Sequence, residues 1–223
     1  MAKLQTDFAS RFDSLSEKLH AYDARISHLE EKEKENTLLK AQVADLQNQL
    51  NQQAQYTLNS ELEIIGLPET PSENPYHMVL TAASKLGMVL EEEDVNYASR
   101  AGPPRRSGDK SNTQPRPLVV SFVRRAKREE FLKNARTRRS SLTSKDVVPA
   151  EPEKKMYVNE RLTSDSRHLF RDTRAWVKEH GYKYCWTRGG KIYVRKHEGG
   201  DGSPAIQIRS NGDLHNLSGK PAG

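Results

Sequence analysis

The sequence has little cysteine, no long apolar run and few acidic residues in its second half. Cys185 is the only cysteine, which excludes an intrachain disulfide framework and a cysteine-based zinc site. The seven histidines do not have metal-ligand spacing, so we expect neither a metal nor a cofactor. No apolar run reaches the roughly 18 residues of a membrane span, and the N-terminus has no apolar signal core. We therefore expect an intracellular protein, in the cytoplasm, the nucleus or both.

Motifs of catalysis are also missing. The chain has no glycine-rich phosphate loop before Lys-Ser or Lys-Thr, no nucleophile elbow and no cluster of metal ligands. Candidate acids such as Asp165 and Glu160 are explained more simply as a helix cap and a strand-end residue. We therefore expect that the protein is not an enzyme.

The charge is unevenly distributed along the chain. Hydrophobic residues make up 34% and charged residues 30%, which favours small domains over one large core. Residues 1–59 have a net charge of −2 and residues 60–99 of −7, whereas residues 100–223 have +15. Such a basic half favours phosphate polymers or anionic membranes as partners, although a merely solubilising surface remains the alternative.

Residues 1–59 are predicted to form a coiled coil. Residues 5–57 contain no glycine or proline, and apolar residues recur with alternating spacings of four and three from Phe8 to Leu29. The repeat lapses at Glu33 and Asn36 and resumes with shifted phase, which indicates a stammer or a local break. At about 1.5 Å per residue the helix would reach roughly 80 Å. We expect self-association through these residues: Phe12, Leu15, Leu19, Tyr22, Arg25, Ile26, Leu29, Glu30, Val43, Leu46 and Leu50.

Two opposing signals bear on the number of helices in the coiled coil. One β-branched residue at an a position beside a leucine at d weakly favours a dimer. The segment from Arg25 to Glu30, however, has the Arg-h-x-x-h-Glu pattern of three-stranded coiled coils, in which the arginine reaches the glutamate of a neighbour. We favour a homotrimer over a dimer. An antiparallel helix that folds onto the chain's own domains is the remaining alternative.

Residues 60–160 are predicted to form an α+β domain with the order β-α-β-β-α-β. The expected strands are 61–67, 95–101, 118–124 and 155–158, and the expected helices are 75–86 and 127–139. This is the ferredoxin-like arrangement that RNA-recognition motifs (RRMs) use. The strand at 118–124 has only one aromatic residue, Phe122, and no glycine, so we do not expect a base-stacking platform on this RRM-like sheet.

The basic residues of this domain are candidates for phosphate contacts. One group lies in the loop at 102–117, and the other lies on the helix at 127–139, with Phe131 and Leu132 inward and the basic residues outward. A solvated helix face is the alternative. The candidates are Arg105, Arg106, Arg116, Arg124, Arg125, Lys127, Arg128, Arg136, Arg138 and Arg139.

Residues 161–217 are predicted to form a small α+β domain, followed by a disordered tail at 218–223. Thr163 is the expected N-cap of a helix that Gly181 ends. A turn at Gly189 and Gly190 would make a hairpin with rings and cations on one face, a combination that suits single strands. A shift of register by one residue would instead make the aromatic face the core. The candidates are Arg167, Arg171, Arg174, Lys178, Tyr184, Trp186, Arg188, Lys191, Tyr193 and Arg195.

Three stretches resemble a known family. They are Ile64-Ile-Gly-Leu-Pro68, Met156-Tyr-Val-Asn-Glu-Arg-Leu-Thr163 and Gly181-Tyr-Lys-Tyr-Cys-Trp-Thr-Arg-Gly-Gly-Lys-Ile-Tyr-Val-Arg-Lys196. They are similar to the baculovirus few-polyhedra (FP) protein family and to first-frame proteins of LINE-type retrotransposons. The resemblance, over roughly residues 60–217, implies a trimer that coats RNA and acts as a nucleic-acid chaperone. It also implies that the basic positions of both C-terminal modules line a binding groove.

Together these features predict a non-enzymatic, oligomeric protein that binds RNA, single-stranded DNA or both. Phosphate and stacking contacts would make that binding tolerant of sequence, and several linked sites would raise avidity. A coiled-coil scaffold or viral assembly factor that binds acidic proteins is the alternative function.

Overall fold

The computed structural model describes residues 2–103, 114–138, 142–148, 153–197 and 204–218. It divides into two compact units, residues 1–50 and residues 51–223. Among the described residues, no helix is both long enough and apolar enough to cross a bilayer. The expected tail at 218–223 lies almost wholly outside the described residues.

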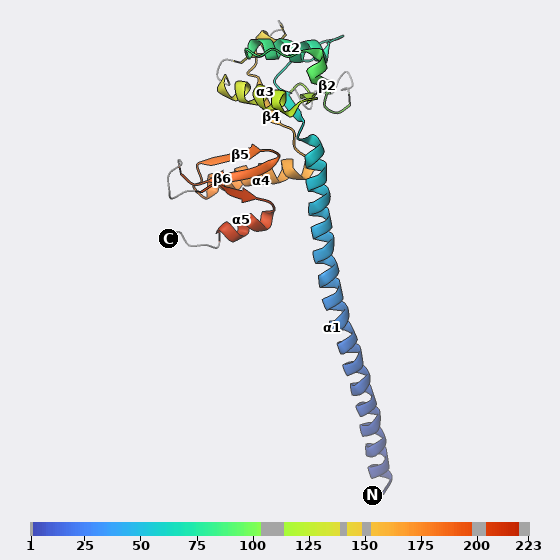
Figure 1. Ribbon diagram of the computed structural model, residues 1–223. Helices are drawn as coiled ribbons and strands as arrows, with labels where there is room; N and C mark the ends of the chain where they lie inside the picture. The colour runs from blue at the N-terminus through green and yellow to red at the C-terminus, as the bar shows by residue number, and fades with distance from the viewer. Residues whose placement is uncertain (1, 104–113, 139–141, 149–152, 198–203, 219–223) are drawn as a thin grey trace. The chain divides into compact units, whose positions relative to one another are not determined.

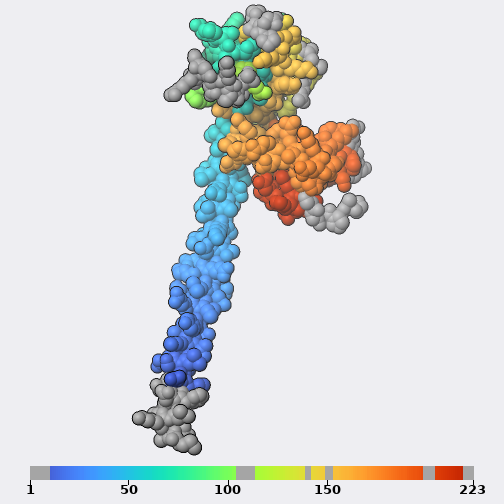
Figure 2. Space-filling view, turned by 180° about the vertical axis from the view of Figure 1, so that it is seen from behind, coloured from blue at the N-terminus to red at the C-terminus, as the bar shows by residue number. Residues whose placement is uncertain are grey.

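The first unit is a single helix that continues into the second. Helix α1 runs without interruption over Ala2–Leu58, so the lapse in the repeat at Glu33 and Asn36 does not break it (Figure 1). Figure 2 shows the side chains along this helix from residue 11 onward. Its heptad side chains are more than half exposed in the single chain, from Phe12 at 64% to Leu50 at 65%. A continuous stripe of exposed apolar side chains on one helix is what a coiled coil buries between chains.

After the last turns of α1, the second unit contains a four-stranded antiparallel sheet. Strands β1 (Glu61–Ile65), β2 (Val95–Arg100), β3 (Leu118–Phe122) and β4 (Tyr157–Glu160) lie in the order β2-β3-β1-β4. Helix α2 (Pro75–Lys85) follows β1, and helix α3 (Arg125–Thr137) follows β3 (Figure 1). Two short 3-10 turns, Glu92–Asp94 and Ser144–Asp146, were not predicted.

The ends of these elements differ from the sequence-based expectation by a few residues. Strand β4 was expected at 155–158 but lies at Tyr157–Glu160, because Lys155 makes only an isolated bridge to Thr143. Helix α2 begins after Asn74, whose side-chain oxygen accepts the N–H groups of Tyr76 and His77. This N-cap was missed, although asparagine before proline at the first helical position is a typical start signal.

The core of the sheet lies under the two helices. Leu62, Ile64, Val79, Leu118 and Phe131 are completely buried there. The ring of Phe122 is also buried and lies 5.6 Å from that of Phe131, so it is not available for stacking on bases. The one aromatic residue of this strand is therefore part of the core.

The C-terminal module packs a three-stranded antiparallel sheet on two helices. Helix α4 (Ser164–Glu179) leads to strands β5 (Tyr184–Arg188), β6 (Lys191–Arg195) and β7 (Ile206–Ile208), and helix α5 (Asn211–Ser218) ends the module. The Thr163 hydroxyl accepts the N–H of Ser166, as expected of the N-cap. Burial raises the pKa of Cys185 to about 11, so this thiol stays protonated at neutral pH.

Candidate nucleic-acid interface

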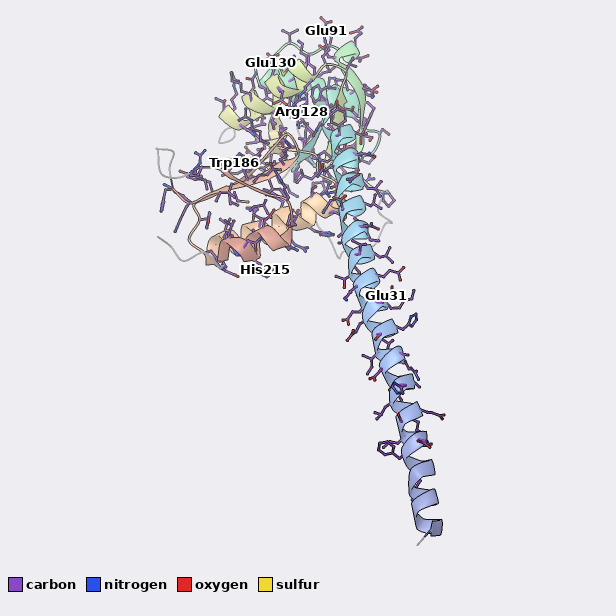
Figure 3. The ribbon with its side chains drawn as sticks, turned by 60° about the horizontal axis from the view of Figure 1, so that its bottom comes forward. Glu31, Glu91, Arg128, Glu130, Trp186 and His215 are labelled. Atoms are coloured by element: carbon purple, nitrogen blue, oxygen red, sulfur yellow. The ribbon has the colours of Figure 1, made fainter. Side chains whose placement is uncertain are left out.

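The register of the β5–β6 hairpin decides which of its faces is exposed. Trp186 pairs with Tyr193, and Cys185 pairs with Val194. Val194 is fully buried in the cluster that also contains Val177 of α4. Because side chains alternate along a strand, Trp186 and Tyr193 lie on the opposite face, as Figure 3 shows for Trp186. The alternative in which the aromatic face is the core is therefore wrong.

That aromatic face forms part of a groove of about 600 Å³. Among the described residues, its walls contain four cationic and three aromatic side chains and no carboxylate. The lining residues are Tyr56, Asn59, Arg125, Trp186, Arg188, Gly189, Lys191, Tyr193, Arg195 and Ala205. Five of the predicted hairpin residues thus come together with Arg125 from the other module.

The rings and cations in the groove are in direct contact. The Trp186 and Tyr193 rings are nearly parallel, with an interplanar angle of 21° and centroids 5.8 Å apart. The guanidinium of Arg195 lies 5.4 Å from the centre of the Trp186 ring, within cation–π range. Its Nε atom is buried and has no hydrogen-bond partner among the described residues. The groove therefore combines flat apolar surface with positive charge.

The last turn of α1 supplies a second wall that sequence reasoning missed. Tyr56 is 77% exposed and, with Asn59, lines the groove. The preceding residue, Gln55, is buried: its amide donates to the carbonyl of Arg161 at 2.9 Å and accepts the N–H of Thr163 at 3.0 Å. The only signal in the sequence is that Tyr56 is an aromatic residue off the heptad positions, in a polar turn.

A buried carboxylate holds the hairpin turn beside the groove. Oε1 of Glu160 accepts the N–H of Gly189 at 2.9 Å, and Oε2 accepts the N–H of Gly190 at 3.2 Å. Both glycines have positive φ, +59° and +73°. Sequence reasoning treated Glu160 as a plain strand-end residue, whereas it joins the hairpin to the four-stranded sheet.

Arg128 corrects the expectation that all basic residues of helix α3 point outward. It is 1% exposed, and its Nη1 lies 2.8 Å from Oε1 of Glu129 and 3.3 Å from Oε1 of Glu160 (Figure 3). Arg128 precedes Phe131 by three residues and therefore shares its inward face. As a buried residue it cannot contact nucleic acid, and its assignment as a binding residue is wrong.

Several other predicted cations are engaged within the chain. Arg124 bonds to the buried carboxylate of Asp94, and this hydrogen bond holds the pKa of Asp94 below its usual value. Lys127 donates to the carbonyl of Val89 at 2.7 Å. Apart from Arg125, none of the predicted cations of this module that the structure describes lines the groove. Arg116 pairs with Glu69, Arg136 donates to the carbonyl of Thr187, and Arg138 donates to the carbonyl of Lys85.

The predicted cationic stripe on α4 also lies outside the groove lining. Arg167 pairs with Glu63 at 2.7 Å, Arg171 pairs with Asp172, and Arg174 lies 5.8 Å over the Phe170 ring. Lys178 is exposed on the same helix, and Tyr184 of β5 is not in the lining either. Arg105, Arg106 and Arg139 fall outside the described residues.

The open face of the four-stranded sheet is occupied by carboxylates. Glu61 and Glu63 are both buried and lie near the guanidinium of Arg161. Burial and a hydrogen bond with Glu61 raise the pKa of Tyr97 to about 12. Because these carboxylates already pair with Arg161 and Arg167, this face offers a phosphate less positive charge than the hairpin groove, which is the better candidate. Within the described ranges there is also no group of three side chains placed to hold a metal ion.

Comparison with known protein families gives a match for the C-terminal module. Residues 163–218 match the family described as baculovirus FP protein domain 2. The matched segment is 56 of the 223 residues, from the Thr163 cap through α5, and it includes the whole hairpin. It supports the resemblance to the baculovirus FP family over this module. No curated protein matches the chain.

Proposed function

We propose that the protein binds single-stranded nucleic acid, RNA or DNA, in the hairpin groove without catalysing a reaction. The observation that carries the proposal is the composition of the groove: Trp186 and Tyr193 stack beside Arg188, Lys191 and Arg195, and none of the described lining residues is a carboxylate. Single strands expose both phosphates and unstacked bases, and such a surface offers a partner for each.

The order of elements in the middle domain supports this proposal. The chain order β1-α2-β2-β3-α3-β4 and the sheet order β2-β3-β1-β4 support the assignment of a split βαβ domain. We propose that it is an RRM-like domain in which Glu61 and Glu63 occupy the sheet face that RRMs use to stack bases. Its role is then to present Arg125 to the groove and to hold the hairpin through Glu160.

We further propose that α1 gathers copies of the groove into an oligomer, with three strands favoured over two. The exposed heptad stripe from Phe12 to Leu50 supports self-association, and the pattern from Arg25 to Glu30 favours a trimer. Linked sites on one flexible strand raise the overall affinity without any new contact. Nucleic-acid packaging of this kind also fits a relationship to the first-frame proteins of retrotransposons.

Substitution of one ring tests the function directly. We expect Trp186→Ala to weaken binding of a single-stranded oligonucleotide by about 10-fold, because stacking on one aromatic ring contributes about 1–3 kcal/mol. Binding of a duplex, whose bases are already stacked, should change much less. Tyr184→Ala removes a ring of the same strand outside the groove and is the matched control. Equal losses for single strand and duplex would contradict the proposal.

A competition experiment distinguishes nucleic-acid binding from the alternative function, a scaffold for acidic proteins. Nucleic acid and polyglutamate share negative charge, but only nucleic acid has bases to stack. Two results together would favour the scaffold function. Polyglutamate would displace a single-stranded oligonucleotide at equal charge concentration, and Trp186→Ala would leave the affinity for both ligands unchanged.

A further inference from the structure

We propose that Tyr56 completes the groove as a sandwich in which one unpaired nucleobase stacks between the end of α1 and the hairpin rings. This inference rests on the proposed function and adds a binding residue and a ligand class to it. The ligand is a nucleobase, which binds through its ring face, and not merely a phosphate chain.

The exposure of Tyr56 is the first observation. It is the most exposed of the large hydrophobic residues of the described chain, at 77%, yet it lies off the heptad positions that Val43, Leu46 and Leu50 define. Burial between coiled-coil strands therefore does not explain it. It lines the same groove as Trp186 and Tyr193, so three rings border one cavity of about 600 Å³.

The second observation is that the last turns of α1 are firmly held against the C-terminal module. The side chain of Asn51 accepts the Thr163 hydroxyl at 2.6 Å and donates to that of Ser166 at 3.3 Å. One turn later both ends of the Gln55 amide are bonded. Tyr56 directly follows this fixed residue, so its backbone position is set before a ligand arrives.

The third observation concerns the opposite wall. A Cβ atom on Gly190 would lie 2.5 Å from Cγ of Gln55, so the hairpin turn and α1 approach each other as closely as glycine allows. The same turn is held from the other side by Glu160. Both walls of the groove are thus anchored independently of any ligand, and preorganised rings lose little entropy when a base enters.

The charges of the groove indicate where the phosphate of the same nucleotide lies. Arg125 contributes from α3, and Arg188 and Lys191 flank the hairpin turn. The Arg125 side chain is 71% exposed, and its ion pair with Glu129 is long, at 3.9 Å. It therefore remains available to a phosphate. We therefore assign the rings to the base and these cations to the backbone on either side of it.

The proposal is tested with Tyr56→Ala and Tyr56→Phe on the full-length protein. The ligand is an oligouridylate of about five nucleotides, short enough to occupy one groove and to exclude avidity between copies. We expect Tyr56→Ala to weaken binding by about 10-fold and Tyr56→Phe to stay within about 2-fold of wild type, because stacking needs the ring and not the hydroxyl. Gln52→Ala, at an exposed position one turn earlier, is the control and should have no effect.

The outcomes separate this inference from the proposed function. If the wild type binds and Trp186→Ala weakens binding, but Tyr56→Ala binds like wild type, the sandwich is wrong and the groove function stands. If the wild type does not bind at all, the groove function itself fails. A loss of affinity in Tyr56→Ala with a changed sedimentation coefficient would place Tyr56 in a contact between copies and would overturn the inference.

Discussion

Arg128 and Glu160 form a buried ion pair across 32 positions of sequence, with 3.3 Å between Nη1 and Oε1 and both side chains 2% exposed. The pair lies between α3 and β4, and Glu160 extends it to the backbone of the hairpin turn. One carboxylate therefore connects the core of the middle domain to the edge of the groove.

Removal of Arg128 should cost stability. Arg128→Ala leaves Glu160 buried without its cation, and breaking a buried pair typically costs about 3–5 kcal/mol. We expect a loss of about 3 kcal/mol, the low end of this range, because the N–H groups of Gly189 and Gly190 still donate to the Glu160 carboxylate. Arg125→Ala, at an exposed position on the same helix, should leave the free energy of unfolding within about 0.5 kcal/mol. Urea denaturation of both variants measures the contrast, and equal losses would contradict it.

The two glycines of the hairpin turn should differ in their tolerance of a side chain. Gly189→Ala meets no described residue within 4 Å and suffers only the cost of positive φ, about 1 kcal/mol. Gly190→Ala adds a Cβ 2.5 Å from the buried Gln55, whose displacement breaks two hydrogen bonds. We expect at least twice the destabilisation for Gly190→Ala in thermal unfolding. Equal melting temperatures would show that α1 and the turn are not packed in this way.

Part of this architecture could be predicted from the sequence, because it depends on local periodicity. The hairpin register followed from two adjacent glycines and alternating side chains, and the exposed stripe of α1 followed from its heptad spacing. Arg128 was assigned wrongly because the density of charge on α3 obscured the inward face that its spacing from Phe131 indicates. Tyr56 and Asn59 were missed because their role depends on docking between segments about 130 residues apart, which no local pattern encodes.

The pairing of Glu73 with Arg100 should make the free energy of unfolding depend on pH in the acidic range. A bidentate hydrogen bond from the buried guanidinium lowers the pKa of Glu73 below 4.5. A lowered pKa means that the folded state favours the carboxylate, so this contribution is complete above about pH 4.5 and is lost as the pH falls through the folded value. Glu73→Gln should lower stability at about pH 6 and have a smaller effect at about pH 3. Urea midpoints at both values provide the measurement, and a loss that grew on acidification would contradict the assignment.

Self-association through α1 should be abolished by charge in the heptad stripe. Ile26→Asp together with Leu29→Asp places carboxylates where neighbouring strands would bury apolar side chains. We expect sedimentation equilibrium to show a trimer for the wild type and a monomer for the variant. Binding of a long oligonucleotide should weaken much more than binding of a short one, because only the long one spans several grooves. A monomeric wild type at micromolar concentration would contradict the oligomer.

The central claim is that the cations of the groove bind the backbone of a single strand. Equilibrium binding of an oligouridylate of about 15 nucleotides between about 50 and 200 mM salt tests it most directly, for wild type and for Arg188→Ala with Lys191→Ala. We expect log affinity to fall linearly with log salt, and the double variant to bind more weakly with a slope smaller by about 1.4, since each lost phosphate contact removes about 0.7. Affinity that does not respond to salt, or identical curves for the two proteins, would contradict the account.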